Sequence, residues 1–286
     1  MNRLLAVAIP TCSQSAADIR IGYVLEALAM QPPSEHFEAL DIYIWDEGAV
    51  PMTTDRWVQL ALELLVRRGH NPIYLRRGSS RGVAAARRNL IAAIAPEHER
   101  ILFIDDDLIP MPGSLDALLC AAATVESFGF LQGSKVELDA SRTYHNDINK
   151  LTENDVTAPL SRLWFGDAAF LLVDRSALSY VDWEIVTRFT EEGLPGEDVA
   201  MTLMIADRVS CFGAAAAIGY HMSLATPRWR WEVPSDLLQF ELLKHVVSAE
   251  TLERALPHLG KYVGGSTGPD GGESVAVPEA LQRGPA

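Results

Sequence analysis

The 286-residue chain has few cysteines and no long apolar run. Its three cysteines, Cys12, Cys120 and Cys211, are odd in number and far apart, so they form neither a disulfide framework nor a zinc-ligand spacing. No apolar stretch reaches the ~20 residues of a membrane-spanning helix. The short apolar opening is not followed by a longer hydrophobic region and a cleavage site. These absences predict a soluble protein of the reducing cytoplasm, without a membrane span.

Basic residues are also scarce, with 24 Lys and Arg against 38 Asp and Glu and a formal net charge of −14. A nucleic-acid-binding protein needs a basic surface that displaces counterions from phosphates, so this charge argues against nucleic acid as a partner. A small substrate that carries phosphate remains compatible with it, provided that a metal ion or a local basic cluster offsets the repulsion.

Apolar runs alternate with helical patterns through the first half of the chain. The apolar runs cover residues 4–9, 40–45, 72–75 and 101–104, and the helical patterns cover 16–30, 55–68 and 83–94. Short strands separated by helices of this length indicate an α/β fold, with a mainly parallel central sheet and helices on both faces.

The second half is less regular. It predicts a loop at 139–154, strands at 168–173 and 211–220, a helix at 198–208, and a helix or helix pair at 235–256. From residue 263 onward the chain is rich in Gly, Pro and Ser, which predicts a disordered tail. We expect one catalytic domain over 1–262, divided near residue 137, followed by this tail over 263–286.

Polar side chains follow three of the predicted strands. They are Thr11 after the first strand, Asp46 and Glu47 after the second, and the carboxylate triplet Asp105, Asp106 and Asp107 after the fourth. Ligands of parallel sheets bind beyond the carboxyl ends of the strands, so these groups are expected to converge on one edge.

The carboxylate triplet directly follows a buried strand, where three like charges repel one another unless a cation or hydrogen bonds compensate them. Hard oxygen ligands of this kind suit Mg²⁺ or Mn²⁺. A solvated acidic turn or a helix cap is the simpler interpretation. The position at a strand end favours the metal.

Residues 103–115 (FIDDDLIPMPGSL) resemble the metal-binding DxD segment of the GT-A glycosyltransferases, and most of all the inverting bacterial family 2. The resemblance implies the GT-A fold, a nucleoside-diphosphate-sugar donor and Mg²⁺ or Mn²⁺ as cofactor. It assigns the metal to Asp107 and the ribose contact to Asp106, with Asp105 as a second candidate for either role.

Further segments resemble the family in the expected order, which implies a donor site. Pro10 and Thr11 match the end of its first strand, beside the nucleoside. Either Asp46 or Glu47 would contact the base; the family usually has aspartate at the second position, so uracil is less firmly implied. Arg87 or Arg81 would face the donor. The family commonly has asparagine directly after this arginine, whereas here Arg88 stands between Arg87 and Asn89.

The acceptor side and the catalytic base also follow from the resemblance. Residues 166–178 resemble the acceptor-side strand, and residues 193–201 resemble the Glu-Asp motif, which makes Asp198 the general base. The helix N-terminus is expected to keep this carboxylate ionised, although a simple helix cap is the alternative. His221 is a candidate additional ligand of the metal or of the diphosphate, or a structural histidine. The expected acceptor contacts are Trp164, Gly166, Asp167 and Glu197.

The implied reaction is sugar transfer from a donor, expected to be UDP-linked, to an unknown acceptor hydroxyl with inversion. A nucleotidyltransferase is one alternative, but residues 10–14 (PTCSQ) lack the glycine and lysine of its usual phosphate loop. A catalytically inactive nucleotide-sugar-binding protein is the other. The presence of both Asp107 and Asp198 argues against it.

Overall fold

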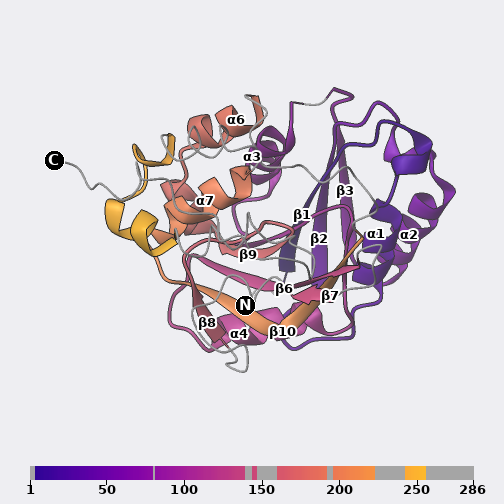
Figure 1. Ribbon diagram of the computed structural model, residues 1–286. Coiled ribbons are helices and arrows are strands. Elements are labelled where there is room, and N and C mark those ends of the chain that lie inside the picture. The colour runs from indigo at the N-terminus through magenta and orange to yellow at the C-terminus, as the bar shows by residue number, and fades with distance from the viewer. Residues whose placement is uncertain are drawn as a thin grey trace, which may run out of the picture.

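The computed structural model describes residues 4–79, 81–138, 144–146, 160–191, 196–222 and 242–255. These residues build one ten-stranded sheet with helices packed on both of its faces (Figure 1). The strand order is β3-β2-β1-β4-β9-β6-β10-β5, while β7 pairs with β6 and β8 with β10. The α/β architecture predicted from the sequence is therefore present.

The first half of the chain forms the parallel part of the sheet. The elements are β1 (Leu4–Thr11), α1 (Ile21–Ala29), β2 (Ala39–Asp46), α2 (Arg56–Arg67), β3 (Asn71–Arg76), α3 (Val83–Ala93) and β4 (Arg100–Ile104). Strand β1 pairs in parallel with β2 and β4, and β2 pairs in parallel with β3. The first predicted helix is shorter than expected, because residues 16–18 form a separate 3-10 turn, η1 (Ala16–Asp18).

The second half adds strands that mostly run antiparallel. The elements are β5 (Leu108–Pro110), α4 (Ser114–Ala123), β6 (Phe130–Leu138), β7 (Tyr144–Asn146), β8 (Leu160–Leu163), β9 (Phe170–Asp174), η3 (Arg175–Tyr180), α6 (Trp183–Glu191), α7 (Glu197–Ala206) and β10 (Cys211–His221). Among the described strands beyond β4, β6 and β10 are the one parallel pair. The uninterrupted parallel arrangement is thus confined to β1 to β4.

Several predicted elements of the second half need correction or lie outside the described residues. Strand β7 falls within residues 139–154, where the sequence predicts a loop. Of the predicted helix or helix pair at 235–256, residues 242–243 and 249–255 are helical with a turn between them, and 235–241 and 256 lie outside the described residues. The predicted tail at 263–286 also lies outside it. The described helices are short, and none of them is long and apolar enough to cross a membrane.

Strand β1 separates two hydrophobic clusters, one on each face of the sheet. Leu5, Val7 and Ile9 pack with α1, α2 and α4, whereas Ala6 and Ala8 pack with α3, α6 and α7. Successive side chains of a strand point to opposite faces, so a strand covered on both sides is apolar without interruption. This packing explains the unbroken apolar run at the start of the chain, and it anchors the strand ends that carry the polar groups.

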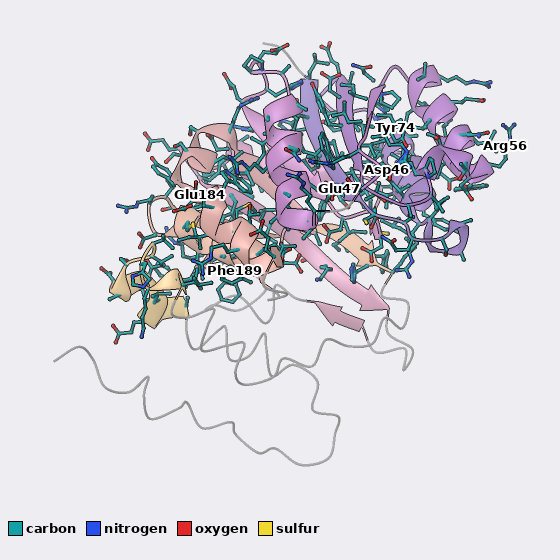
Figure 2. All side chains as sticks on the ribbon, turned by 90° about the horizontal axis from the view of Figure 1, so that it is seen from above. Asp46, Glu47, Arg56, Tyr74, Glu184 and Phe189 are labelled. Atoms are coloured by element: carbon teal, nitrogen blue, oxygen red, sulfur yellow. The ribbon has the colours of Figure 1, made fainter. Side chains whose placement is uncertain are left out.

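The loop after β2 lies toward the middle of the molecule. Figure 2 shows Asp46 and Glu47 there, whereas Arg56, at the start of α2, projects from one end. The polar residues that end β2 therefore lie beside the edge where β1 and β4 also end.

Candidate active site

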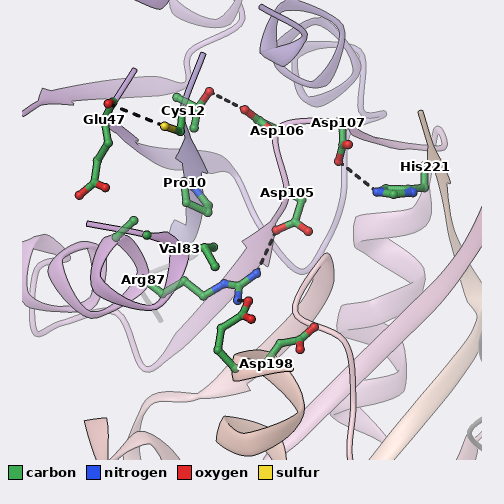
Figure 3. A pocket seen from close by; sticks show the side chains of 14 residues that line it. Pro10, Cys12, Glu47, Val83, Arg87, Asp105, Asp106, Asp107, Asp198 and His221 are labelled. Atoms are coloured by element: carbon green, nitrogen blue, oxygen red, sulfur yellow. Dashed lines mark hydrogen bonds and ion pairs between the residues drawn. The ribbon is translucent and has the colours of Figure 1, made fainter. Parts of the chain in front are cut away.

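A pocket of about 370 Å³ opens at the carboxyl ends of the parallel strands, between the starts of α3 and α7 (Figure 3). Among the residues expected to form the site, its lining includes Pro10, Thr11, Glu47, Arg87, Asp105, Asp106, Asp107, Glu197, Asp198 and His221. Cys12, Gly82, Val83 and Ala86 complete the lining. The expected convergence of the strand ends is confirmed, and α7 and β10 contribute to the same pocket.

The backbone of the carboxylate triplet is held in a turn between three strands. The amide of Asp105 donates to the carbonyl of Ala169 at 3.1 Å, and the amide of Met222 donates to the carbonyl of Asp107 at 2.8 Å. These bonds join the turn after β4 to the segments beside β9 and β10. The direction of the three carboxylates therefore depends on strands from both halves of the chain.

Each carboxylate of the triplet has different partners. The hydroxyl of Thr11 donates to Asp106 (Figure 3). Asp107 lies 3.2 Å from Nε2 of His221 and 3.7 Å from Nη1 of Arg20. Asp105 accepts from Nη2 of Arg87 at 3.1 Å. Only Asp107 pairs with an imidazole, which is itself a common metal ligand.

The triplet is short of positive charge. Burial raises the pKa of Asp106 to about 7; the hydroxyl of Thr11 opposes this shift, and the other two carboxylates add to it. Burial likewise raises the pKa of Asp105, against the opposing charge of Arg87. A divalent cation bound here would favour the ionised form of both groups. The oxygen-rich donor set, joined by His221, fits Mg²⁺ or Mn²⁺.

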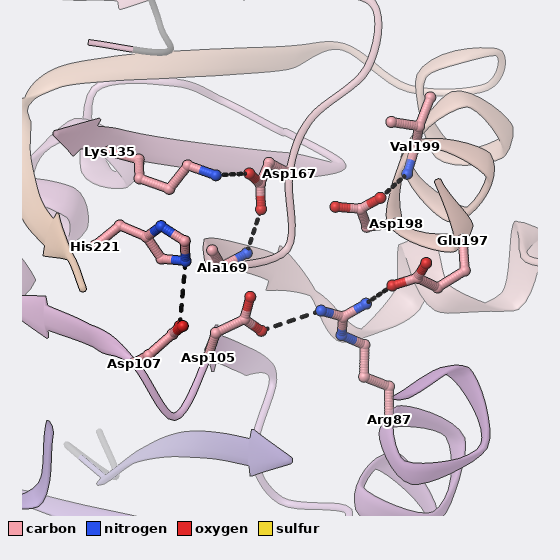
Figure 4. A network of polar contacts seen from close by, with 10 residues as sticks. All are labelled: Arg87, Asp105, Asp107, Lys135, Asp167, Ala169, Glu197, Asp198, Val199 and His221. Carbon is pink, nitrogen blue, oxygen red and sulfur yellow. Dashed lines mark hydrogen bonds and ion pairs between the residues drawn. The ribbon is translucent and has the colours of Figure 1, made fainter. Parts of the chain in front are cut away.

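Arg87 connects the triplet with α7 (Figure 4). Its guanidinium donates to Glu197 at 2.9 Å and to Asp105 at 3.1 Å, and the residue is 3% exposed. Burial alone would lower the pKa of Arg87, but the surrounding carboxylates of Asp105, Glu197, Asp198 and Asp167 raise it. Arg87 therefore stays charged and holds together the two acidic walls of the pocket.

Replacing this guanidinium should destabilise the fold. We expect Arg87→Met to cost on the order of 3 kcal/mol, at the low end of the range for a broken buried ion pair, because the Asp105 side chain is 29% exposed and can rehydrate. Urea unfolding of the variant and the parent measures the difference.

The matched control is Arg88→Met, at the neighbouring exposed position of α3. It should change stability by no more than about 0.5 kcal/mol, as surface substitutions usually do. Equal stability losses in the two variants would contradict a bridging role for Arg87.

Asp198 is the second residue of α7 and lines the pocket on the side away from Glu47 (Figure 3). Burial raises its pKa to about 8, with further contributions from Glu197 and Asp167 and an opposing one from Arg87. The sequence-based expectation that the helix start keeps Asp198 ionised is wrong. The amide of Val199 does donate to it at 2.8 Å, but desolvation outweighs this bond. A carboxylate poised near neutral pH suits proton transfer.

The two acidic residues after β2 have different environments. Asp46 is fully buried and accepts from the amides of Gly48 and Met52, at 2.8 and 3.1 Å, and from the hydroxyl of Tyr74 at 2.7 Å. Burial and this carboxylate raise the pKa of Tyr74 to about 12. Asp46 is not part of the pocket lining, and its bonds within the protein hold the loop after β2 in place.

Glu47, unlike Asp46, borders the pocket. Its carboxylate accepts from the indole of Trp45 at 2.9 Å and from the backbone amide of Arg81 at 2.6 Å. The side chain of Arg81 is exposed, outside the lining. Of the two alternatives for the base contact, Glu47 is therefore the one at the pocket wall.

Three residues expected on the acceptor side, Trp164, Gly166 and Asp167, are not part of the pocket lining. Asp167 forms an ion pair with Lys135 and accepts from the amide of Ala169 at 2.7 Å (Figure 4). Burial would raise its pKa, but Lys135 lowers it to about 2. Gly166 is in tight packing, since an added Cβ would come 2.6 Å from Oε1 of Gln132.

The indole of Trp164 is engaged with arginines. The guanidinium carbons of Arg162 and Arg254 lie 5.1 and 4.9 Å from its ring centroid. Trp164 is not part of the pocket lining. Its stacking partners are thus cations of the protein itself.

Sequence reasoning missed Lys135, the buried partner of Asp167. The one signal for it was a lysine inside residues 130–136 (FLQGSKV), since a charged residue in a buried run needs a partner. It also missed Arg20, which lies near Asp107 but precedes α1 without any distinctive motif.

No family model matches the chain, and no curated protein matches its sequence. Solved structures do match. A complex of UDP with residues 1–349 of S. aureus TarS has a TM-score of 0.61 at 15% identity, covering 91% of this chain and 72% of that one. Another TarS structure has a TM-score of 0.55 at 15% identity, covering 76% of this chain and 36% of that one.

GalNAc-T7 with UDP, GalNAc and Mn²⁺ is also similar, with a TM-score of 0.55 at 10% identity, covering 85% of this chain and 48% of that one. The chain therefore spans about a third of the TarS chain in the second of its two structures and about half of the GalNAc-T7 chain. These neighbours are glycosyltransferases of the GT-A fold. The GT-A fold expected from the sequence is confirmed.

Proposed function

We propose that the protein is a metal-dependent glycosyltransferase that moves a sugar from a nucleoside-diphosphate sugar to an acceptor hydroxyl with inversion. Its main support is one pocket of a GT-A fold that is lined by both the carboxylate triplet and Asp198. Glycosyltransferase neighbours bound to UDP add support for a nucleotide-sugar donor, and Mn²⁺ in one of them adds support for a divalent cation.

Asp107 and His221 are the residues that we propose hold the cation, with Asp105 beside them. The acidic side chains of the lining are Glu47, Asp105, Asp106, Asp107, Glu197 and Asp198, and its basic ones are Arg87 and His221. A diphosphate would be repelled by this excess of carboxylates. When bound, Mg²⁺ or Mn²⁺ supplies positive charge that stabilises the leaving diphosphate.

The nucleoside is proposed to lie at the ends of β1 and β2. Pro10 and Thr11 form one wall there, and Glu47 forms the other. The hydroxyl of Thr11 donates to Asp106, which we propose accepts from a ribose hydroxyl. Of the two candidates for the base contact we propose Glu47, because the oxygens of Asp46 are buried among donors of the protein.

Asp198 is proposed to act as the general base. It takes the proton of the acceptor hydroxyl while that oxygen bonds to the anomeric carbon, and the bond from this carbon to the diphosphate oxygen breaks. The other carboxylate of the pair, Glu197, is bonded to Arg87 and acts as a positioning residue. Arg87 also opposes the rise in the pKa of Asp198, which keeps the base form accessible near neutral pH.

The acceptor is proposed to enter on the side of α7 and β9. Asp167 and Gly166 support this wall from behind, through the ion pair with Lys135 and the close packing against Gln132. The stacking of Trp164 with Arg162 and Arg254 makes it a support of this region, without direct contact to the sugar.

Thermal denaturation with a panel of nucleotides tests the proposed donor. A ligand at 100 times its Kd adds about 2.7 kcal/mol to stability, which for a chain of this size raises Tm by roughly 4–5 °C. We expect UDP and UDP-sugars to reach this shift with Mn²⁺ and to lose it in EDTA.

Glu47→Gln tests the proposed contact to the nucleobase, and it should reduce the preference for UDP over GDP and ADP. A clear preference of the parent for a purine diphosphate would contradict the uracil assignment. If no nucleotide raises Tm with or without Mn²⁺, the proposed function itself is wrong.

A further inference from the structure

Outside the pocket, three side chains with metal-binding atoms come together between the loop after α1 and helix α4. They are His36 of the loop, and Asp116 and Cys120, one turn apart on α4. Nε2 of His36 lies 3.0 Å from Sγ of Cys120, and that sulfur lies 3.9 Å from Oδ2 of Asp116. We propose that these residues form a second metal site, selective for Zn²⁺ or a similar borderline ion.

The distances are compatible with a single ion. All three candidate ligand atoms lie within 4.8 Å of one another. In a tetrahedral zinc site, with Zn–S near 2.3 Å and Zn–N near 2.0 Å, the sulfur and nitrogen are about 3.5 Å apart. The sulfur of Cys120 lies 3.0 Å from Nε2 of His36, which is shorter than this value, and 3.9 Å from Oδ2 of Asp116, which is longer. Small rotations of side chains that are not fully buried would bring the ligands to tetrahedral spacing.

Ser34 holds two of the ligands in place. Its hydroxyl donates to Oδ1 of Asp116 and accepts from the backbone amide of His36 at 2.9 Å. The other carboxylate oxygen of Asp116 is the one nearest Cys120. Such bonds to metal ligands fix their orientation before the ion arrives, and their loss typically weakens metal binding 10–100-fold.

The charge around Cys120 favours a cation. Desolvation raises the pKa of its thiol, and the negative charges of Asp116 and Glu35 add to this shift. A bound metal ion displaces the thiol proton and makes the thiolate a ligand.

The ligand types separate this site from the pocket. Thiolate, imidazole and carboxylate suit Zn²⁺, whereas the carboxylate-rich pocket suits Mg²⁺ or Mn²⁺. A zinc ion here would join the loop after α1 to α4. That loop is already tied to the turn after β5, because Gln31 accepts from the amide of Gly113 at 3.1 Å and donates to the carbonyl of Met111 at 3.1 Å. The site would thus brace the segment that follows the carboxylate triplet.

Titration of the metal-free full-length chain with Co²⁺ tests the site without reference to any enzymatic activity. We expect one equivalent to produce thiolate-to-cobalt charge-transfer absorption, and Zn²⁺ to displace it. Cys120→Ser should abolish the absorption, and His36→Gln should weaken Co²⁺ binding at least 10-fold. Ser34→Ala should weaken it about 10-fold, as expected for loss of an orienting bond.

Matched controls separate this site from the other thiols and from the pocket. Cys12→Ser removes the other exposed cysteine, and His245→Gln removes an exposed histidine elsewhere; both should leave the absorption unchanged. An ion bound only at Asp107 and His221 gives no thiolate absorption. Absence of the absorption in the parent, or its persistence in Cys120→Ser, would overturn the proposal, whatever the outcome for glycosyl transfer.

Discussion

Asp198→Asn should lower the single-turnover rate of sugar transfer by about 10²–10⁴-fold, the usual contribution of a general base, or by more. The substitution keeps the size of the side chain but removes the proton acceptor. Donor affinity, measured by calorimetry, should be nearly unchanged, because the proposed role of the carboxylate is to take a proton from the acceptor and not to bind the donor. The two measurements together distinguish a catalytic base from a donor-binding residue.

An aspartate that only caps a helix provides the control. Asp182, exposed at the start of α6, accepts from the amides of Glu184 and Ile185 at 3.0 and 3.3 Å. Asparagine caps about as well as aspartate, so Asp182→Asn should transfer sugar at the parent rate. If Asp198→Asn also keeps the parent rate, Asp198 is a cap and the proposed mechanism has no base. A protein that binds the donor but never transfers sugar would support the inactive-binder alternative.

The pH profile supplies a second measurement on the same residue. Because the pKa of Asp198 is raised to about 8, the group is protonated at lower pH and becomes a base only as pH rises. The kcat/KM for the acceptor should therefore rise through pH 8 and level off about one pH unit above it. In Asp198→Asn the residual rate should lose this dependence. A parent profile that is flat from pH 6 to 9 would contradict the assignment.

Asp107→Asn should abolish Mn²⁺-dependent donor binding and turnover together. Its carboxylate, paired with His221 at 3.2 Å, is the proposed metal ligand, and a bound metal ion is worth several kcal/mol of charge stabilisation. We expect donor affinity to fall by about 10²-fold or more, since each 1.4 kcal/mol is a factor of ten. Calorimetric titration of UDP with and without Mn²⁺ measures it.

Asp106→Asn is the comparison within the same triplet. The asparagine still accepts from Thr11, so donor binding should weaken less and keep its dependence on Mn²⁺. Full activity of the parent enzyme in EDTA would contradict the metal requirement. Equal losses in the two variants would contradict the particular role of Asp107.

The sequence predicted those parts of the fold that depend on local pattern. Strands β1 to β4 and helices α1 to α3 were recognisable because their apolar periodicity follows from burial on one or both faces of a parallel sheet. Strand β6 was not, since Phe130–Leu138 contains glutamine, glycine, serine and lysine, and pairs with β9 and β10, which lie much later in the chain. Pairing over such distances leaves no periodic signal in the segment itself.

The carboxylate triplet at a strand end and the acidic pair Glu197 and Asp198 at a helix start were also legible in the sequence. Which neighbour each carboxylate meets was not, because that depends on side-chain directions set by distant elements. Only the tertiary structure turns Asp46 inward to Tyr74 and leaves Glu47 at the pocket wall. Only the tertiary structure surrounds Asp198 so that desolvation outweighs its helix-start amide.

The cysteines show the same division most clearly. Their number and wide spacing determined that no cysteine pair or cysteine-rich motif could bind zinc, and that conclusion concerns neighbours in sequence. Packing of α4 against the loop after α1 brings Cys120 to His36, 84 positions away. Metal ligands need proximity in space, which spacing along the chain reveals only when one local segment supplies them. The composition and local patterns therefore determined the class of fold and the residues able to do chemistry, while the folded packing decided which of them meet.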